Sequence, residues 1–389
     1  MINNHLSRLM MMAVALFAFG TASAQKTVKN KKDGAYTFTI LKNNDAHAVQ
    51  NQNRTGTCWS FSSLSFFESE LARMGKGDYH LSEMFVVRNT YMDKSDRYVR
   101  MNGFLNYGPG GAFHDVRNVI RDHGMVPESV YGGLNYGFDK HNHGEMDEVL
   151  LGMVKAVVKN KSRRLTDSWK PAISSTLDAY LGEAPKTFEV DGKEYTPESY
   201  AKESGLNPDD YVELTSYTHH PFYSKFIIEV PDNWAWDEVY NLPIDEFMAV
   251  MENAIEEGYT IAWAADVSEK GFSHKNGLAV VPDFDAMSKK EKEKMWDNVI
   301  PELKITQEMR QKAFDDYRTT DDHGMHITGL AKDQDGKKFY IVKNSWGDES
   351  NECGGYFYAS ENFVKYKTMD IMIHKDAIPK NIRKKLGLK

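Results

Sequence analysis

The sequence predicts a mixed α+β protein, and two patterns far apart in the chain support this class. From Trp59 on, the segment "WSFSSLSFFESELARM" places apolar residues three and four positions apart and then stops at Gly75, which is typical of an amphipathic helix. Far downstream, "HITGLA" and "KFYIVKNSWG" have the apolar content of two strands, and the turn "KDQDGK" joins them. We therefore expect helices and sheet in one fold.

The composition limits the class of protein. The chain has 389 residues, of which 41% are hydrophobic and 12% aromatic. Such a composition is ordinary for a soluble enzyme with a filled core, and it excludes a disordered or collagen-like chain. The length allows two or three domains or one elaborated catalytic domain. The formal net charge of -8 argues against a protein that coats nucleic acid, so we expect no nucleic-acid partner.

The N-terminus has the features of a signal peptide over residues 1–24. A polar start containing Arg8 precedes the apolar stretch "LMMMAVALFAFG", and "TASA" before Gln25 has the small residues of a cleavage site. An apolar stretch of about 12 residues is too short to cross a bilayer. We therefore expect cleavage after Ala24, no membrane anchor, and an exported protein that is periplasmic or secreted.

The chain has two cysteines, Cys58 and Cys353, and their surroundings restrict their use. A disulfide between them would close a loop of almost the whole protein, and the sequence leaves this pairing open. No CxxC, HExxH, GxxxxGK[ST] or GxGxxG motif occurs, so we expect no metal and no nucleotide cofactor. For Cys58 the remaining alternatives are a buried structural thiol and a catalytic one.

The position of Cys58 favours catalysis. A cysteine nucleophile must become a thiolate, which a helix N-terminus and a nearby imidazolium both stabilise. Cys58 directly precedes the predicted helix. A histidine near the start of the first downstream strand and Asn344 at the end of the second can lie close together in a hairpin. The sequence thus predicts a nucleophile, a base and a residue that orients the base.

Four short blocks resemble the active-site motifs of papain-type cysteine peptidases. The blocks are Gln52, Cys58-Trp59-Ser60-Phe61, Asp322-His323-Gly324 and Asn344-Ser345-Trp346-Gly347. They follow one another in the same order as in those peptidases, and the spacing between Gln52 and Cys58 is also the same. Two departures are similar to the bleomycin hydrolase and aminopeptidase C branch. Thr55 replaces a disulfide cysteine, and the distance from Cys58 to His323 far exceeds the roughly 130 to 150 residues of papain and cathepsins.

The resemblance implies a papain-like two-lobed fold over residues 25–389. A helical lobe with the nucleophile is expected at 35–135, a largely helical insertion at 136–225, a β-rich lobe with the base and the asparagine at 226–375, and a C-terminal tail at 376–389. Helical periodicity in "DEVLLGMVKAVVKNKSRRL" and "SWKPAISSTLDAYLG" agrees with such an insertion. In the family the inserted elements contact other subunits in a homohexamer; a monomeric helical cap is the alternative.

The resemblance also assigns catalytic roles. Cys58 would attack the scissile carbonyl, and His323 would first pair with the thiolate and then protonate the leaving amine. His323 is preferred over His326 because Gly329 stands at the family's distance from it. Asn344 would orient the imidazole under the cover of Trp346. Gln52 would join the backbone N–H of Cys58 in stabilising the oxyanion.

The remaining expectations concern specificity. Gly110 and Gly111 resemble the paired glycines that let a peptide backbone lie alongside the enzyme, a plain turn being the alternative. Lys389, or Leu388 after trimming, would offer a terminal carboxylate to the substrate's α-amino group. The expected function is an exported, thiol-dependent aminopeptidase acting on peptides. An endopeptidase or dipeptidyl peptidase is the first alternative, and a non-catalytic binding or assembly protein the second.

Overall fold

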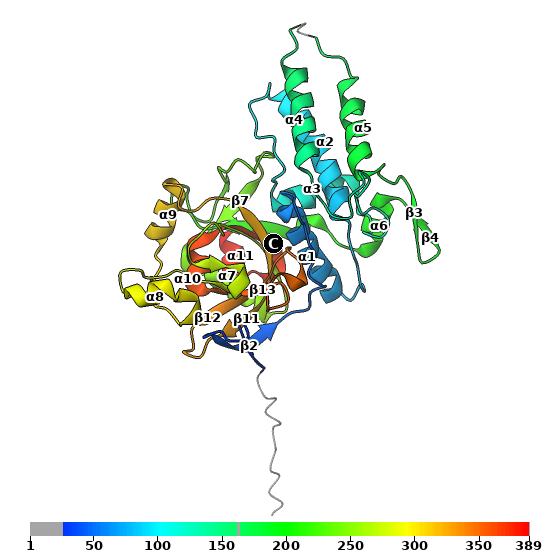
Figure 1. Ribbon diagram of the computed structural model, residues 1–389. Helices are drawn as coiled ribbons and strands as arrows, with labels where there is room; N and C mark the ends of the chain where they lie inside the picture. Colours follow the sequence, from blue (N-terminus) through cyan, green and yellow to red (C-terminus); the bar gives the residue numbers. More distant parts are fainter. Residues whose placement is uncertain (1–25, 162–163, 389) are drawn as a thin grey trace, which may run out of the picture.

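The computed structural model describes residues 26–161 and 164–388, and a twelve-stranded sheet runs through this part of the chain (Figure 1). Most strands follow one another in a single path: β6 (Lys225–Ile227), β7 (Glu238–Asn241), β5 (Tyr211–Thr215), β14 (Thr368–His374), β8 (Ile261–Ala265), β11 (His323–Lys332), β12 (Lys338–Lys343), β13 (Tyr356–Ser360), β10 (Leu278–Ala279) and β9 (Phe272–Ser273). β2 (Thr37–Asn43) also pairs with β11, and β1 (Thr27–Lys29) pairs with β2.

Helices and strands pack together around three buried apolar clusters, which confirms the predicted α+β class. The helical part contains α1 (Cys58–Arg73), α2 (Glu83–Arg100), α3 (Phe113–His123) and α6 (Pro197–Ser204), which share one buried apolar cluster. The β-rich part is accompanied by α7 (Ile244–Glu256), α8 (Lys289–Glu293), α9 (Gln307–Asp315), α10 (Glu361–Lys367) and α11 (Lys380–Lys385). Two further apolar clusters fill this part.

Helix α1 joins the two parts. It contacts β11 and β8 on one side and α2 and α3 on the other. The sequence predicts a half-buried helix, but 13 of its 16 residues are buried. The helix lies between two layers, so its apparently polar face is also covered. Small serines make this possible, because their hydroxyls can bond within the protein, as Ser62 Oγ does to the carbonyl oxygen of Cys58 at 2.7 Å.

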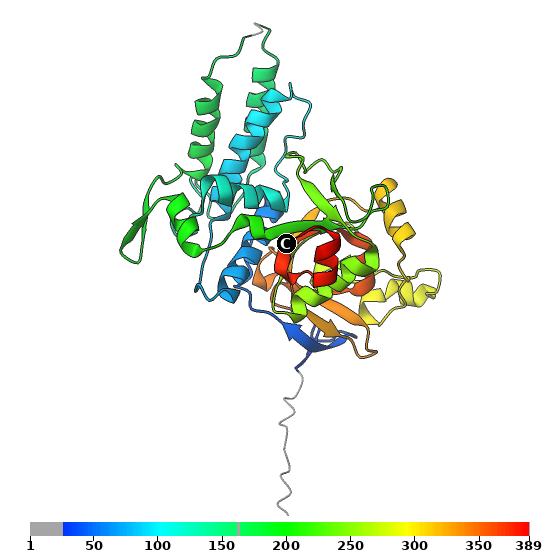
Figure 2. The ribbon, with the colours of Figure 1, turned by 180° about the vertical axis from the view of Figure 1, so that it is seen from behind.

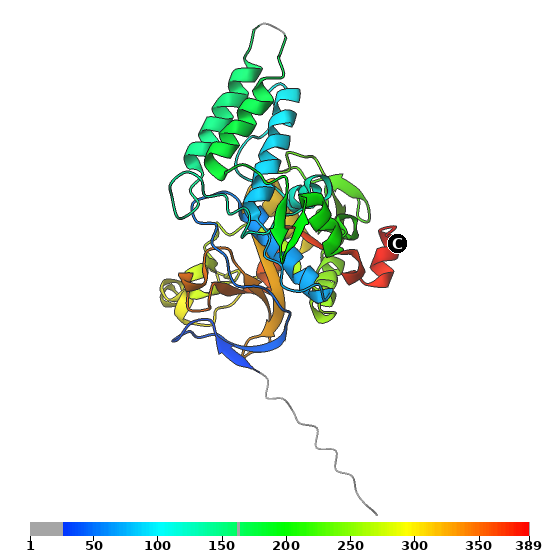
Figure 3. The same cartoon turned by 90° about the vertical axis from the view of Figure 1, so that its right-hand side faces the viewer.

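A helical arm projects from the body (Figures 1 and 3). It consists of α4 (Gly144–Val158) and α5 (Trp169–Leu181), which pack against α2. Buried apolar side chains line the contact between them, including Leu150, Val154, Ile173 and Leu177. The hairpin of β3 (Phe188–Val190) and β4 (Lys193–Tyr195) follows. The range 136–225 therefore contains the helices that its periodicity predicts, but it also contains β5, which belongs to the main sheet.

The C-terminal tail packs on α7, and Figure 2 shows α11 beside that helix. Ile382 and Leu386 are buried in the same apolar cluster as α7, and Lys385 forms an ion pair with Glu246 at 2.5 Å. Within the described ranges, no helix combines the length and apolar content that crossing a bilayer would require. The expected signal peptide, residues 1–24, lies outside the described residues.

Candidate active site

Cys58 is the first residue of α1, and the loop before it leaves the helix end uncapped. Thr57 makes no side-chain cap; its hydroxyl instead bonds that of Thr55 at 2.6 Å. The Thr55 hydroxyl also donates to the carbonyl oxygen of Gln52 at 2.9 Å, which closes the loop where the papain pattern has a cysteine. The first N–H groups of α1 therefore keep their partial positive charge beside the thiol.

The hairpin of β11 and β12 brings the histidine and the asparagine together. His323 begins β11, Asn344 follows β12, and His323 Nε2 lies 2.8 Å from Asn344 Oδ1. This contact leaves Nδ1 of the imidazole for Cys58. Trp346 stacks on His323, with ring centroids 4.8 Å apart, and shields the contact from water.

The structure separates the two histidines that compete for the role of base. His323 lines the same cavity as Cys58. His326 is also buried, but its Nδ1 contacts Ser65 Oγ of α1 at 2.9 Å. His326 therefore supports the packing of α1 on the sheet.

His274 is a site residue that sequence reasoning missed. It lies in the single turn after β9, and its Nδ1 is 3.2 Å from Asn344 Nδ2. Burial, with a smaller contribution from His323, lowers the pKa of His274 to about 4, so a neutral ring accepts this hydrogen bond. Its Nε2 contacts Ser350 Oγ at 2.7 Å. Because the Asn344 amide donates to His274, its oxygen must face His323. No local motif could have revealed a contact between residues so far apart in the chain.

We expect His274→Ala to lower kcat about five-fold with little change in KM, because one net hydrogen bond is worth about 1 kcal/mol. The acid limb of the pH profile should move to lower pH, since a less firmly oriented Asn344 amide stabilises the His323 imidazolium less well and lowers the pKa of His323. Steady-state kinetics across pH would measure both effects. His274→Gln, which keeps an acceptor, should recover part of the rate; equal loss in both variants would contradict a positioning role.

Gln52 has a fixed orientation beside Cys58. Its side-chain oxygen accepts a hydrogen bond from Ser345 Oγ at 2.6 Å, and its Nε2 donates to the carbonyl oxygen of Thr55 at 2.9 Å. One N–H of the amide thus remains for a substrate oxygen. This is the arrangement that an oxyanion donor requires.

The catalytic pair opens onto a cavity of about 330 Å³ that Gly110 and Gly111 also line. Trp59 Nε1 donates to the carbonyl oxygen of Pro109 at 3.0 Å, and Lys94 Nζ to that of Gly108 at 2.9 Å. A Cβ at Gly110 would lie 1.9 Å from Asp232 Oδ2, and one at Gly111 would lie 2.9 Å from the Trp59 ring. The Trp59 ring therefore restricts position 111 to glycine, and the Asp232 carboxylate would have to move for a side chain at 110. Neither glycine has a positive φ.

The comparisons with known proteins agree with this geometry. Residues 73–388 match the model of the Peptidase C1-like family. The chain belongs to this family. Aminopeptidase C of Streptococcus thermophilus is 24% identical, over 92% of this chain and 86% of its own, and aminopeptidase C of Lactobacillus delbrueckii subsp. lactis is 23% identical, over 94% and 87%. The crystal structure of PepW from a Lactobacillus has a TM-score of 0.70 at 21% identity, over 90% of this chain and 84% of that one.

The predicted family resemblance is confirmed, and the Peptidase C1-like chain is a cysteine peptidase. The matched range begins after Gln52 and Cys58. Gln52 lies in the loop before α1, and Cys58 is the first residue of that helix. Gln52 accepts a hydrogen bond from Ser345, which lies just after the hairpin of β11 and β12. Cys58 lines the same cavity as His323 at the start of that hairpin.

Burial favours the neutral forms of both catalytic groups in this peptidase. It raises the pKa of Cys58 to about 12, although hydrogen bonding to the backbone of Gly324 and Trp59 opposes the shift. It also lowers the pKa of His323, against the effect of Asn344. A lone thiolate or a lone imidazolium is therefore disfavoured. Transfer of the proton from Sγ to Nδ1 creates both charges at once, and their attraction offsets the cost of burial.

Alkylation of Cys58 by iodoacetamide should therefore depend on His323. In His323→Ala the thiol has no internal proton acceptor, so its reaction should rise only at pH values above the ordinary thiol pKa of about 8.5. The unsubstituted protein should react at lower pH, because His323 takes the proton. Mass mapping separates Cys58 from Cys353, and superimposable pH profiles of the two proteins would contradict the pairing.

The second cysteine lies elsewhere. Cys353 is a free thiol, as is Cys58, so the structure contains no disulfide between them. Its Sγ lies 2.8 Å from the carbonyl oxygen of Asn30, and burial raises its pKa to about 11. Cys353 therefore has a structural position.

Two clusters in the described part of the chain could hold a metal ion, and neither lies at the cavity. They are His47, Asp78 and His80, and His219, His220 and Glu229, whose potential ligand atoms lie within 4.8 Å of one another. Both are at least partly exposed. The cavity itself contains the groups of a thiol mechanism.

The tail does not reach the cavity in the described residues. No residue of 376–388 lines it, and Leu388 packs beside the cluster that contains α7. Lys389, the expected source of the terminal carboxylate, lies outside the described residues. The apolar contacts of Ile382 and Leu386 explain this position, because they bind the tail to α7.

Proposed function

We propose that this protein is a cysteine aminopeptidase that removes residues from the free N-termini of peptides. The observation that carries the proposal is the arrangement of Cys58 at a helix N-terminus, in one cavity with a histidine that contacts Asn344. The relatives named aminopeptidase C, which match this chain over most of their length, support the exopeptidase preference.

The reaction proceeds by acyl transfer. The Cys58 proton moves to His323 Nδ1, Sγ bonds to the carbonyl carbon, and the oxyanion receives hydrogen bonds from Gln52 and the backbone N–H of Cys58. The C–N bond then breaks as the imidazolium gives its proton to the leaving amine. Water attacks the thioester with His323 as base, which releases the N-terminal residue and restores the thiol.

Matched fluorogenic substrates test the proposal. An aminoacyl amide with a free α-amino group should be cleaved, whereas its N-acetylated counterpart should not. Equal cleavage of both would identify an endopeptidase, and release of dipeptides from longer peptides would identify a dipeptidyl peptidase. Failure to cleave any peptide would return the protein to the class of binding or assembly proteins.

Three finer expectations stay predictions. The position of residues 376–388 on α7 does not support gating by the tail, so the proposal does not depend on it. Export would give a mature protein that begins at Gln25, which intact-mass analysis measures. A homohexamer would use the projecting arm, on which Val149 is exposed, and light scattering measures its mass.

A further inference from the structure

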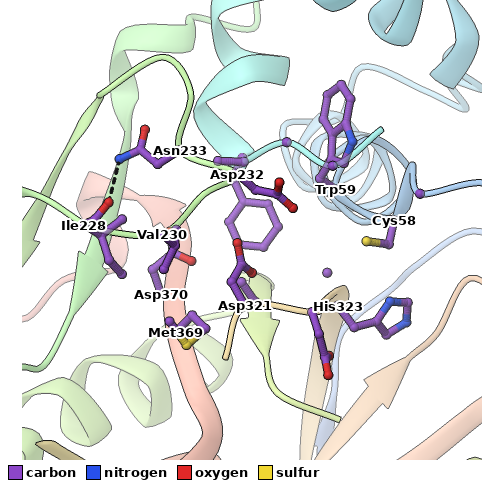
Figure 4. Close-up of a pocket in the computed structure, with 18 of the residues that line it drawn as sticks. Cys58, Trp59, Ile228, Val230, Asp232, Asn233, Asp321, His323, Met369 and Asp370 are labelled. Atoms are coloured by element: carbon purple, nitrogen blue, oxygen red, sulfur yellow. Dashed lines mark hydrogen bonds between the residues drawn. The ribbon is translucent and has the colours of Figure 1, made fainter. Parts of the chain in front are cut away.

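Three aspartates form an acidic wall in the catalytic cavity: Asp232, Asp321 and Asp370. Asp321 lies two residues before His323, and Asp370 lies on β14 where the pairing with β8 is irregular. Figure 4 shows Cys58 and His323 on one side of the cavity and Asp370 on the other, with Asp232 and Asp321 between them. The nucleophile and the acidic wall thus face the same space.

The carboxylates of the wall lack cationic partners. Among the described residues no Lys, Arg or His side chain donates a hydrogen bond to Asp321 or Asp370, and Asp370 is only 8% exposed. The side-chain hydrogen bond of Asp370 is instead with another acid, Glu213. Asp232 receives one hydrogen bond, from Asn106 Nδ2 at 2.9 Å. The wall is therefore a set of carboxyl groups that faces the cavity and has no ion-pair partner among the described residues.

The nearest cationic side chains are already engaged. Lys94 donates to the carbonyl oxygens of Gly108 and Gly110. His114, whose pKa is raised to about 9 chiefly by Glu213 against the effect of burial, forms its ion pair with that residue at 3.0 Å. Neither supplies a hydrogen bond to Asp321 or Asp370.

Crowding of the acids makes their ionised forms costly. Burial and the neighbouring Asp232 and Asp322 raise the pKa of Asp321 to about 7, and burial, Glu213 and Asp321 raise the pKa of Asp370 well above its ordinary value. A cation placed among them would reverse this cost. A compact ammonium group with three N–H donors matches several carboxylate acceptors.

We propose that the acidic wall of Asp232, Asp321 and Asp370 binds the α-ammonium group of the substrate's first residue and thereby selects free N-termini. In such a substrate the α-nitrogen is separated from the scissile carbonyl carbon by the α-carbon alone, so an ammonium group near Cys58 lies close to the wall. Asp232 and Asp321 line the same cavity as Cys58 and lie between Cys58 and Asp370 in Figure 4. The inference rests on the proposed aminopeptidase function and gives its selectivity a source within the cavity.

The test compares leucyl-aminomethylcoumarin with 4-methylpentanoyl-aminomethylcoumarin, which lacks only the α-amino group. Charge-assisted hydrogen bonds contribute about 1.5 to 3 kcal/mol, so the unsubstituted protein should prefer the leucyl substrate by roughly 10- to 150-fold in kcat/KM. In Asp321→Asn and Asp370→Asn this ratio should fall at least about five-fold. The exposed Asp139→Asn is the matched control and should keep the full ratio.

Each outcome decides between alternatives. An unchanged ratio in both variants, with the leucyl substrate still preferred, would overturn the role of the wall while leaving the aminopeptidase proposal intact. Absence of any preference in the unsubstituted protein would instead overturn the aminopeptidase proposal. A variant that cleaves the des-amino substrate is folded, so loss of folding is recognised separately. A third outcome concerns N-terminally blocked peptides that carry lysine two residues before the cleaved bond. If the unsubstituted protein cleaves these peptides and the variants do not, the wall binds the ammonium group of the lysine side chain. That result would also overturn the inference.

Discussion

Cys58→Ala should lower kcat/KM for a free-amine peptide substrate by about 10⁴-fold or more, with an unchanged melting temperature. The thiol provides the covalent route, and removing the nucleophile of such a catalytic unit leaves only the residual effect of binding and the oxyanion donors. Cys58 makes no disulfide and heads a helix whose packing depends on the residues after it. Steady-state hydrolysis and thermal unfolding of the variant measure the two quantities.

Cys353→Ala provides the matched control for this prediction. Its thiol is free like that of Cys58, but it does not line the cavity. This variant should retain most of the activity. Full activity in Cys58→Ala would refute the thiol mechanism, whatever the behaviour of the control.

Gln52→Ala should lower kcat by about 100- to 1,000-fold with a small change in KM, because an oxyanion donor acts mainly in the transition state. The hydrogen bonds to Ser345 and Thr55 fix the amide before substrate binds, so the enzyme does not have to reorient it during the reaction. Separate determination of kcat and KM measures the effect.

Ser345→Ala tests the orientation of that amide. It removes the hydroxyl that donates to Gln52 Oε1 and leaves the amide in place, so the expected loss is smaller than that in Gln52→Ala. A large rise in KM in Gln52→Ala, with kcat unchanged, would contradict an oxyanion role and indicate ordinary substrate binding.

The local elements could be predicted because their signals are local. The apolar spacing after Trp59 and the two strands around the turn before Lys337 correspond to α1, β11 and β12. The hairpin also explains why His323 and Asn344 are close, since strand pairing places the start of one beside the end of the other. The resemblance to papain-type peptidases then predicted which residues of the helix and the hairpin belong to one active site.

The rest could not be predicted because it depends on contacts between distant segments. His274 reaches Asn344 across the sheet edge of β9, β10 and β13, and no spacing rule connects the two residues. The burial of the serines in α1 follows from its place between two layers. The acidic wall combines residues of three distant segments, and Asp370 looks like an ordinary strand residue in the sequence. The apolar contacts of Ile382 and Leu386 with the α7 cluster likewise join segments that are far apart in the sequence.

Trapping of the acyl-enzyme tests the central claim most directly. The protein is mixed with excess leucine ester, quenched with acid during turnover, digested and analysed by mass spectrometry. Cys58, His323 and Gln52 acting as described should give a leucyl adduct on the peptide that contains Cys58, and this adduct should be absent in Cys58→Ala. Turnover without an adduct on Cys58, or with the adduct on Cys353, would contradict the mechanism.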